Sequence, residues 1–236
     1  MRLATRGQQE PALDPLRALR GGSWFGALPA AMQDTLLRDA ATRRLAAGQM
    51  LFTRGNAFDG IYGVTAGTVQ IDTHSESGKA ALIGLLGPGS WFGEICLFDG
   101  LARTHDAHAT SAATVLHLQR DKLYAMLSAH PEWWREFGKL LAAKTREAFH
   151  YVEEAQLLPP LARTGRRLVA IAQAYGDLPG LERRSVHIPQ EQLGQMLGLS
   201  RQTVNQALRE LEARGLLRLH YADIELIDLP ALLALT

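Results

Sequence analysis

Residues 188–217, IPQEQLGQMLGLSRQTVNQALRELEARGLL, carry the pattern that decides the fold of the C-terminal part of the chain. The apolar spacing predicts a first helix over residues 190–197. A tight turn at Gly198 would follow, and Ser200 is a strong N-cap candidate for a second helix, which ends where Gly215 can adopt a left-handed conformation. A helix, a glycine turn and a capped helix form the helix-turn-helix pattern.

The polar face of the second predicted helix suits a DNA major groove. It begins with Arg201, Gln202, Asn205, Gln206 and Arg209. Arginine can bond guanine bidentately, and asparagine or glutamine can do the same to adenine. The first turns of such a helix meet the base edges, so Ser200 also belongs to the candidate DNA contacts. A helical hairpin with a solvated polar face is the simpler alternative, but two short strands predicted over residues 215–229 add the wing of a winged helix-turn-helix.

Further candidate contacts with DNA precede this block. Thr164 and Arg166 lie near the start of the preceding predicted helix, where they could contact phosphates and set the register of binding. An N-cap and a solvated arginine explain these two residues equally well.

A long helix is predicted to connect this block to the rest of the chain. It can run from about residue 132 to about residue 158, roughly 40 Å at 1.5 Å per residue, before two prolines end it. Its seam follows the four-three spacing of a short coiled coil, with Leu141, Thr145, Ala148, Val152 and Ala155. The helix could pack on its own domain, but the small residues of the seam favour close approach of a partner helix, so we predict a parallel homodimer.

A second motif lies at residues 89–104, GSWFGEICLFDGLART. A short helix starting at Gly93 and Glu94 would present free backbone N–H groups to an anion. Arg103 can neutralise and bond a phosphate, and Thr104 adds a hydroxyl. Glu94 can accept hydrogen bonds from a ribose. The alternative is a purely structural pair, in which Glu94 and Arg103 form an internal salt bridge.

Composition sets the class of protein. The chain has 236 residues, of which 47% are hydrophobic, so it can bury one large core or two smaller ones. Charged residues make up 21%, and the formal net charge of +1 neither indicates nor excludes nucleic-acid binding. Residues 48–118 are rich in glycine and short apolar alternations, which predicts an antiparallel barrel or sandwich. No apolar run is long enough for a membrane span, and the single cysteine, Cys96, fits a reducing cytoplasm.

In this order the features resemble the cyclic-AMP receptor protein (CRP/FNR) family of bacterial transcription regulators. The resemblance covers nearly the whole chain after about residue 23, and residues 198–217 are its most specific part. It implies an α+β fold with four parts: a flexible N-terminal lead over 1–22, an antiparallel β-roll effector domain over 23–130, a long dimerisation helix over 131–158, and a winged helix-turn-helix DNA-binding domain over 159–236.

The resemblance implies a homodimeric DNA-binding transcription regulator controlled by a small effector in the roll. Effector binding would involve Gly93, Glu94, Arg103 and Thr104, with a cyclic nucleotide, cyclic AMP first, as the expected ligand. Expected partners are RNA polymerase and double-stranded DNA with a roughly palindromic site, because two recognition helices about 34 Å apart meet successive major grooves. Two alternatives stay open: an effector-independent regulator of the same fold, and a nucleotide-binding signalling module with a protein partner.

The base-binding half of the effector site departs from the family pattern. The threonine and serine that bond the adenine in the cyclic-AMP receptor protein correspond to Ala148 and Phe149, and neither can make that bond. Thr145 or His150 could substitute, and Phe149 could stack on a base. Cyclic GMP, another nucleotide or no ligand therefore remain alternatives to cyclic AMP.

The predicted DNA-reading face departs as well. The best-studied member of the family has an arginine, a glutamate and a second arginine at the positions of Arg201, Gln202 and Gln206. Arg201 can keep a guanine contact, whereas the other two positions would recognise different bases. We therefore expect a different half-site.

No metal, haem or iron–sulfur site is predicted. His105 and His108 lie three residues apart on a predicted strand, where their side chains point to opposite faces. Nothing in the sequence supports a histidine as haem ligand, and one cysteine cannot hold an iron–sulfur cluster. Since no carboxylate pair and no Ser-His or Cys-His arrangement can be picked out, we expect no enzyme activity.

Overall fold

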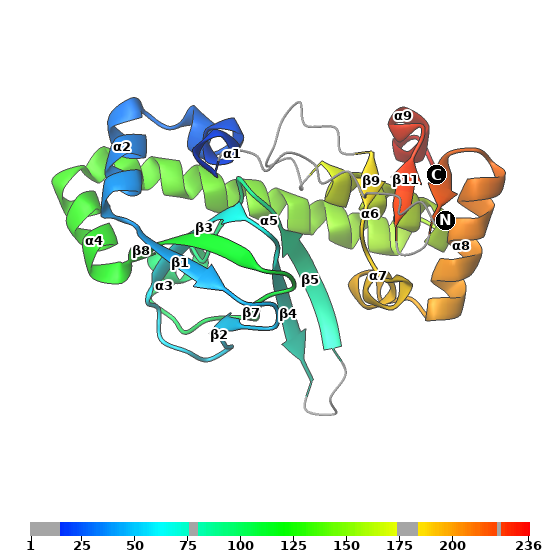
Figure 1. Cartoon of the computed structure of the whole chain (residues 1–236), viewed down its shortest axis with the longest axis horizontal. Helices are drawn as coiled ribbons and strands as arrows, with labels where there is room; N and C mark the ends of the chain where they lie inside the picture. Colours follow the sequence, from blue (N-terminus) through cyan, green and yellow to red (C-terminus); the bar gives the residue numbers. More distant parts are fainter. Residues whose placement is uncertain (1–14, 76–79, 174–183, 221–222) are drawn as a thin grey trace, which may run out of the picture.

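The computed structural model describes residues 15–75, 80–173, 184–220 and 223–236 (Figure 1). Its elements form an N-terminal β-roll, a long helix beside it and a C-terminal winged helix-turn-helix, which confirms the predicted α+β architecture. The long helix, α5 (Trp134–Leu157), runs past the roll toward the C-terminal elements. None of the helices in the described ranges combines the length and the apolar character that a membrane crossing requires.

The roll consists of two four-stranded antiparallel sheets. Their strand orders are β1-β8-β3-β6 and β2-β7-β4-β5. On β4 and β7 the residues Val69, Ile71, Ala107 and Ala109 contribute to the core, and the alternate residues lie on the opposite face of the sheet. The strands are β1 (Ala41–Leu45), β2 (Met50–Phe52), β3 (Gly60–Ala66), β4 (Val69–His74), β5 (Ala80–Leu86), β6 (Trp91–Phe92), β7 (Asp106–Ala109) and β8 (Ala113–Gln119).

A cluster of aromatic side chains anchors α5 to the roll. Trp91 of β6 stacks on Phe25 with their centroids 5.5 Å apart. Trp24 lies 5.6 Å from Trp91 and 5.3 Å from Phe137 of α5, and its indole N–H donates to the Glu136 carbonyl at 2.7 Å. Aromatic pairs of this kind contribute about 0.5–1.5 kcal/mol each beyond the area that they bury. The N-terminal part of α5 is therefore held against the roll.

Part of the lead predicted over residues 1–22 forms a helix in the structure. Residues Pro15–Gly21 form a helix, α1, and Leu19 is fully buried in the same apolar cluster as Phe25 and Trp91. So short a helix is stabilised by burial of its apolar side chain against the roll rather than by its own length. Residues 1–14 lie outside the described part of the chain. The other helices of this domain are η1 (Phe25–Ala27), α2 (Ala30–Asp39), α3 (Ile95–Asp99), α4 (Arg120–Ala129) and η2 (Pro131–Trp133).

The C-terminal domain confirms the predicted helix-turn-helix and its wing. The turn residue Gly198 has φ +64°, and α8 ends in a Schellman motif in which Leu216 N–H bonds Leu211 O and Gly215, at φ +74°, bonds Glu212 O. A third strand, β9, completes a sheet of order β10-β11-β9 and is not predicted from the sequence. The elements are α6 (Pro160–Ala172), β9 (Ser185–Val186), α7 (Gln190–Leu197), α8 (Arg201–Ala213), β10 (Leu217–Leu219), β11 (Ile224–Leu226) and α9 (Leu229–Leu233).

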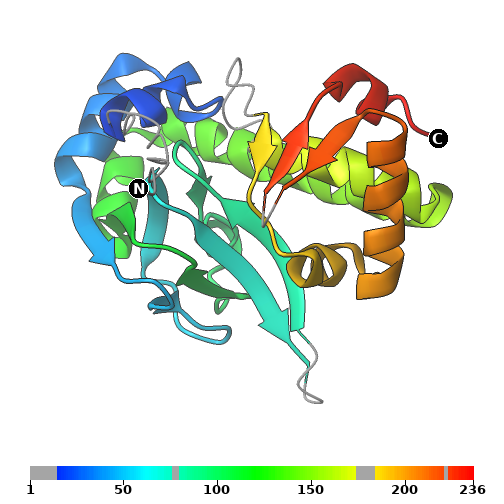
Figure 2. The same ribbon diagram turned by 45° about the vertical axis from the view of Figure 1, so that its right-hand side comes forward.

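The roll and the C-terminal domain contact each other directly. Strand β5 packs against α7 (Figure 2). Leu82 of β5 is buried with the apolar core of the C-terminal domain. The Tyr151 hydroxyl of α5 donates to the Met196 carbonyl of α7 at 2.7 Å, and Arg163 donates to the Leu197 carbonyl at 2.5 Å. The first helix of the helix-turn-helix is thus held by β5 on one side and by the long helix and α6 on the other.

Candidate effector site and nucleic-acid interface

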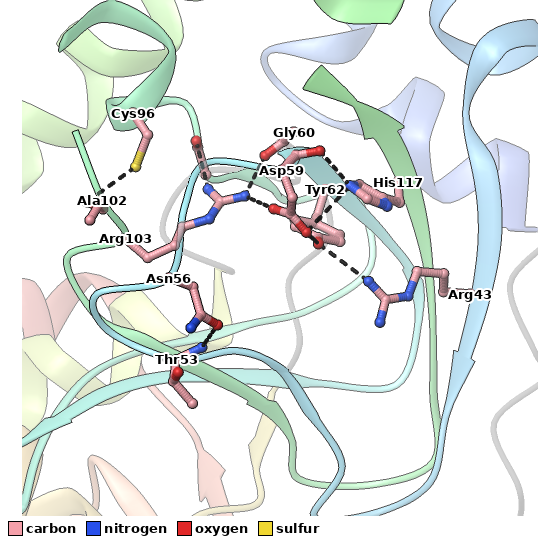
Figure 3. Close-up of polar contacts among 11 residues, drawn as sticks. Arg43, Thr53, Asn56, Asp59, Gly60, Tyr62, Cys96, Ala102, Arg103 and His117 are labelled. Atoms are coloured by element: carbon pink, nitrogen blue, oxygen red, sulfur yellow. Dashed lines mark hydrogen bonds and ion pairs between the residues drawn. The ribbon is translucent and has the colours of Figure 1, made fainter. Parts of the chain in front are cut away.

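The Arg103 guanidinium is buried inside the roll with only 3% of the residue exposed. Nη2 donates to Oδ1 of Asp59 and to the Gly60 carbonyl, and Nη1 donates to the Gly93 carbonyl at 3.0 Å (Figure 3). The guanidinium also lies over the Phe52 ring, 4.3 Å from its centroid. A guanidinium keeps its charge when buried, so these partners compensate for its loss of water.

Asp59 is the anionic partner of this arginine. Its Oδ2 accepts a hydrogen bond from the Tyr62 hydroxyl at 2.5 Å. Burial alone would raise the pKa of Asp59, but the hydrogen bonds from Tyr62 and Arg103 outweigh it and hold the pKa below its usual value. Arg103 therefore forms an internal ion pair with Asp59. The alternative prediction of a Glu94–Arg103 salt bridge is wrong, because Glu94 pairs with Lys144.

Tyr62 and His117 extend the polar cluster across the sheet. The two rings stack with centroids 4.3 Å apart, and His117 Nε2 lies 3.1 Å from the Asp59 carbonyl oxygen. Burial lowers the pKa of His117, although the Asp59 carboxylate opposes that shift. Burial and the bond to Asp59 raise the pKa of Tyr62. At neutral pH the cluster thus holds a neutral imidazole, a neutral phenol and one ion pair.

Glu94 is buried with 1% of the residue exposed and pairs with α5. Its Oε2 accepts from Lys144 Nζ at 3.0 Å, and Lys144 also donates to the Trp91 carbonyl at 2.6 Å. Gly93 before it has φ +94°, and a Cβ on Gly93 would come within 2.7 Å of Arg103 Nη1. The Gly-Glu pair therefore leaves room for the buried arginine and connects the start of α3 to the long helix.

The four predicted effector residues have different partners. Arg103 bonds the Gly93 carbonyl, whereas Glu94 bonds Lys144 and the exposed Thr104 hydroxyl lies 2.8 Å from His105 Nδ1. Sequence reasoning missed Asp59 and Lys144, which lie 44 and 50 residues from their partners. Only the tertiary fold brings them together, and no local spacing signals them.

The recognition helix α8 has the predicted cap and the predicted exposed face. The Ser200 hydroxyl oxygen accepts a hydrogen bond from the Thr203 N–H at 3.1 Å. Four of the predicted side chains are exposed and one is half-buried, and all five line one groove along the helix: Arg201, Gln202, Asn205, Gln206 and Arg209. The half-buried member, Asn205, donates through Nδ2 to Gln190 Oε1 at 3.0 Å.

Thr164 is not available to DNA, contrary to the prediction. Helix α6 begins at Pro160, so Thr164 lies in its second turn and is fully buried. Its hydroxyl donates to the Pro160 carbonyl at 2.7 Å. Arg166 donates to the Leu235 carbonyl at 3.0 Å and lies 3.6 Å from Glu154, so it connects α6 to the residues that follow α9 and to α5.

The predicted dimer seam is an exposed stripe of α5. Thr145, Ala148, Val152 and Ala155 are exposed, or nearly so, and Leu141 at its start is half-buried. Beside the seam, Phe149 is 63% exposed. The Thr145 hydroxyl donates to the Leu141 carbonyl at 2.8 Å, which leaves its oxygen lone pairs free to accept from a ligand. An apolar stripe of this kind on a long helix is typical of an interface.

Comparison with known proteins gives matches at both ends of the long helix. A model of the cyclic nucleotide-binding domain matches residues 42–130, and a model of the Crp-like helix-turn-helix domain matches residues 162–235. The CRP-like cAMP-activated global transcriptional regulator of Mycobacterium tuberculosis is 28% identical over 210 residues, which cover 89% of this chain and 93% of that protein. All of these are regulatory proteins or domains, not enzymes.

Solved structures share the fold over most of the chain. A CRP/FNR-family transcriptional regulator from Thermus thermophilus has a TM-score of 0.65 at 25% identity, covering 81% of this chain and 96% of that one. The c-di-GMP-responsive global regulator CLP of Xanthomonas campestris has a TM-score of 0.68 at 18% identity, covering 85% of this chain and all of that one. The second likeness shows a common fold.

The buried imidazole predicts a pH dependence of stability. Because the pKa of His117 is lower in the folded chain, the unfolded chain binds a proton that the folded chain does not once the pH falls below about 6.5. The free energy of unfolding is therefore expected to decrease on acidification from about pH 7.5 to about pH 5.5, and less steeply in His117→Gln. Urea unfolding followed by circular dichroism measures both slopes. The exposed His150→Gln is the control, and an unchanged slope in His117→Gln would contradict the assignment.

Proposed function

The chain belongs to the CRP/FNR family of transcription regulators, and we propose that it acts as a homodimer that binds DNA. An anionic nucleotide bound in the roll would set its affinity for DNA, and cyclic AMP is the first candidate. DNA binding and the cyclic nucleotide-binding domain come with the family. The capped helix α8, with its exposed Arg201, Gln202 and Gln206, is the observation that carries the proposal. Such a regulator works beside the chromosome, so we expect it in the cytoplasm with RNA polymerase as a further partner.

The effector is proposed to compete with Asp59 for Arg103. Arg103 Nε is buried without a hydrogen-bond partner among the described residues, so it can still donate to an incoming phosphate oxygen. The carboxylate of Asp59 would have to give up its bond to Nη2, because a carboxylate and a phosphate cannot share one guanidinium edge without repulsion. Binding would thus replace an internal anion by a ligand and shift an equilibrium between two arrangements of the roll.

An effector-independent regulator is the second candidate, and the same ion pair favours it. Arg103 and Glu94 both have internal partners without any ligand, Asp59 and Lys144 respectively. These two buried charges are therefore paired when the roll is empty. In that case the pair would serve stability alone, and DNA affinity would not respond to nucleotides.

Calorimetric titration of the full chain with cyclic AMP distinguishes the two candidates, with cyclic GMP and c-di-GMP as comparison ligands. We predict that cyclic AMP binds, that Arg103→Leu abolishes binding, and that Asp59→Asn tightens it because the competing carboxylate is gone. Asn still accepts the hydrogen bond from Tyr62. The buried guanidinium loses its anion, so the empty variant is expected to be less stable, and circular dichroism checks that it folds.

The control is Asp39→Asn, which removes a carboxylate from the exposed pair with Arg38. It is expected to leave the affinity unchanged. No heat with any of the nucleotides, in the wild type or in Asp59→Asn, would favour the effector-independent regulator.

The DNA-reading face predicts that a substitution at Arg201 lowers the affinity for DNA and the preference at one base pair. We expect Arg201→Ala to weaken binding to the best site, selected from random duplexes, by about 1–3 kcal/mol and to relax the preference at one base pair. Arg214→Ala is the matched control, because Arg214 lies at the far end of α8 and pairs with Glu210. Fluorescence anisotropy at fixed salt measures both variants. If the wild type binds DNA only weakly and Arg201→Ala has the same affinity, the result would support a signalling module with a protein partner instead.

The seam on α5 predicts a homodimer. A charge at Val152 would be buried between two helices, so Val152→Asp is expected to shift the chain to monomers and to weaken DNA binding with it. Ala143 lies on the opposite side of the helix from the seam, so Ala143→Asp should leave the dimer intact. Sedimentation equilibrium measures the oligomeric state of the wild type and the two variants. A monomeric wild type would contradict the proposed dimer.

A further inference from the structure

A cluster of side chains that could bind a metal ion lies on strands β4 and β7, on the face opposite their core residues. Asp72 and His74 are two residues apart on β4 and therefore share a face. Asp106 of β7 stands directly opposite Asp72 in the antiparallel register. One candidate ligand atom from each of the three residues lies within 4.8 Å of the other two.

Two electrostatic costs are concentrated in this cluster. Asp72 is only 3% exposed, and its Oδ1 is buried without a hydrogen-bond partner among the described residues. An unsatisfied buried acceptor destabilises the folded chain, and more strongly when it is charged. Asp72 and Asp106 also place two carboxylates directly across a strand pair, where like charges repel. A bound cation would remove both costs.

The neighbouring side chains orient the three residues. His74 Nδ1 lies 3.5 Å from Asp106 Oδ2, and Asp106 Oδ1 accepts the Arg54 backbone N–H at 2.7 Å. Asp72 Oδ2 accepts from Gln70 Nε2 at 2.6 Å and lies 3.5 Å from His108 Nδ1. Each carboxylate thus has one oxygen held by a protein donor, an arrangement typical of the residues that surround metal ligands.

We propose that Asp72, His74 and Asp106 bind a divalent first-row transition-metal ion, with His108 orienting the Asp72 carboxylate. Two carboxylates and an imidazole match the ligand preference of Zn²⁺ and its neighbours, whereas Ca²⁺ and Mg²⁺ prefer sites made of oxygen alone. The His74 side chain is 53% exposed, so an ion can reach the site from solvent. Three protein ligands leave a coordination position for water.

The proposed site differs from the expectation that the chain has no metal site. That expectation rested on His105 and His108, which lie three residues apart along the chain and do not share a strand face. The proposed ligands come instead from two strands, and only the register of β4 against β7 brings them together.

The test is equilibrium dialysis of the untagged, chelator-treated chain against Zn²⁺, with Ca²⁺ and Mg²⁺ in parallel. One Zn²⁺ per chain is expected at the site, with much weaker binding of the other two ions. His74→Gln and Asp106→Asn are expected to lower the affinity at least about tenfold, since even residues outside the first ligand sphere cost 10–100-fold. Co²⁺ substitution gives an absorption spectrum that each variant should lose.

The matched control is His187→Gln. His187 Nδ1 lies 3.0 Å from Asp223 Oδ1 on the surface, and no third ligand joins this pair among the described residues. Its Zn²⁺ affinity should equal that of the wild type. His74 is exposed, so His74→Gln is expected to fold, and circular dichroism checks this. No Zn²⁺ binding, or equal binding by His74→Gln and the wild type, would overturn the proposal.

Discussion

The ion pair between Arg103 and Asp59 is the constraint on which the interior of the roll depends. A guanidinium cannot lose its charge by deprotonation, so its burial requires an anion and carbonyl acceptors at fixed places. Asp59 is the anion, and the backbone carbonyls of Gly60 and Gly93 are the acceptors. The same requirement explains the absence of a side chain at Gly93, where a Cβ would meet the guanidinium. One buried cation thus determines the conformation of two loops that are far apart in the sequence.

The charges around this centre are connected to the long helix and, through it, to the recognition domain. Glu94 follows Gly93 directly and bonds Lys144 of α5. Two turns further on, Tyr151 of the same helix bonds the Met196 carbonyl of α7. A ligand that displaced Asp59 would therefore act next to the residues that position α5, and a shift of α5 would reach the first helix of the helix-turn-helix without passing through any linker. This is a contiguous physical route between the proposed effector site and the helix-turn-helix.

The sequence predicts the features that depend on neighbouring residues and misses those that depend on distant ones. The cap at Ser200, the turn at Gly198 and the C-terminal Schellman motif at Gly215 are local, and all three are present. The prediction for Thr164 failed because position near a helix start does not reveal which side of the helix faces the core. Likewise, the partner of Arg103 follows from strand pairing across the whole roll, which no local pattern contains.

The placement of Leu82 has a consequence for dividing this chain into fragments. This leucine belongs to β5 of the roll, yet its side chain fills part of the apolar core of the C-terminal domain. Cutting the chain between α5 and α6 would expose the apolar Leu82 side chain on the N-terminal fragment and leave a cavity in the apolar core of the C-terminal fragment. Neither fragment would keep the packing that its domain has in the intact chain. The affinity of the fragments for each other, or their self-association, would measure the strength of the contact between the two domains.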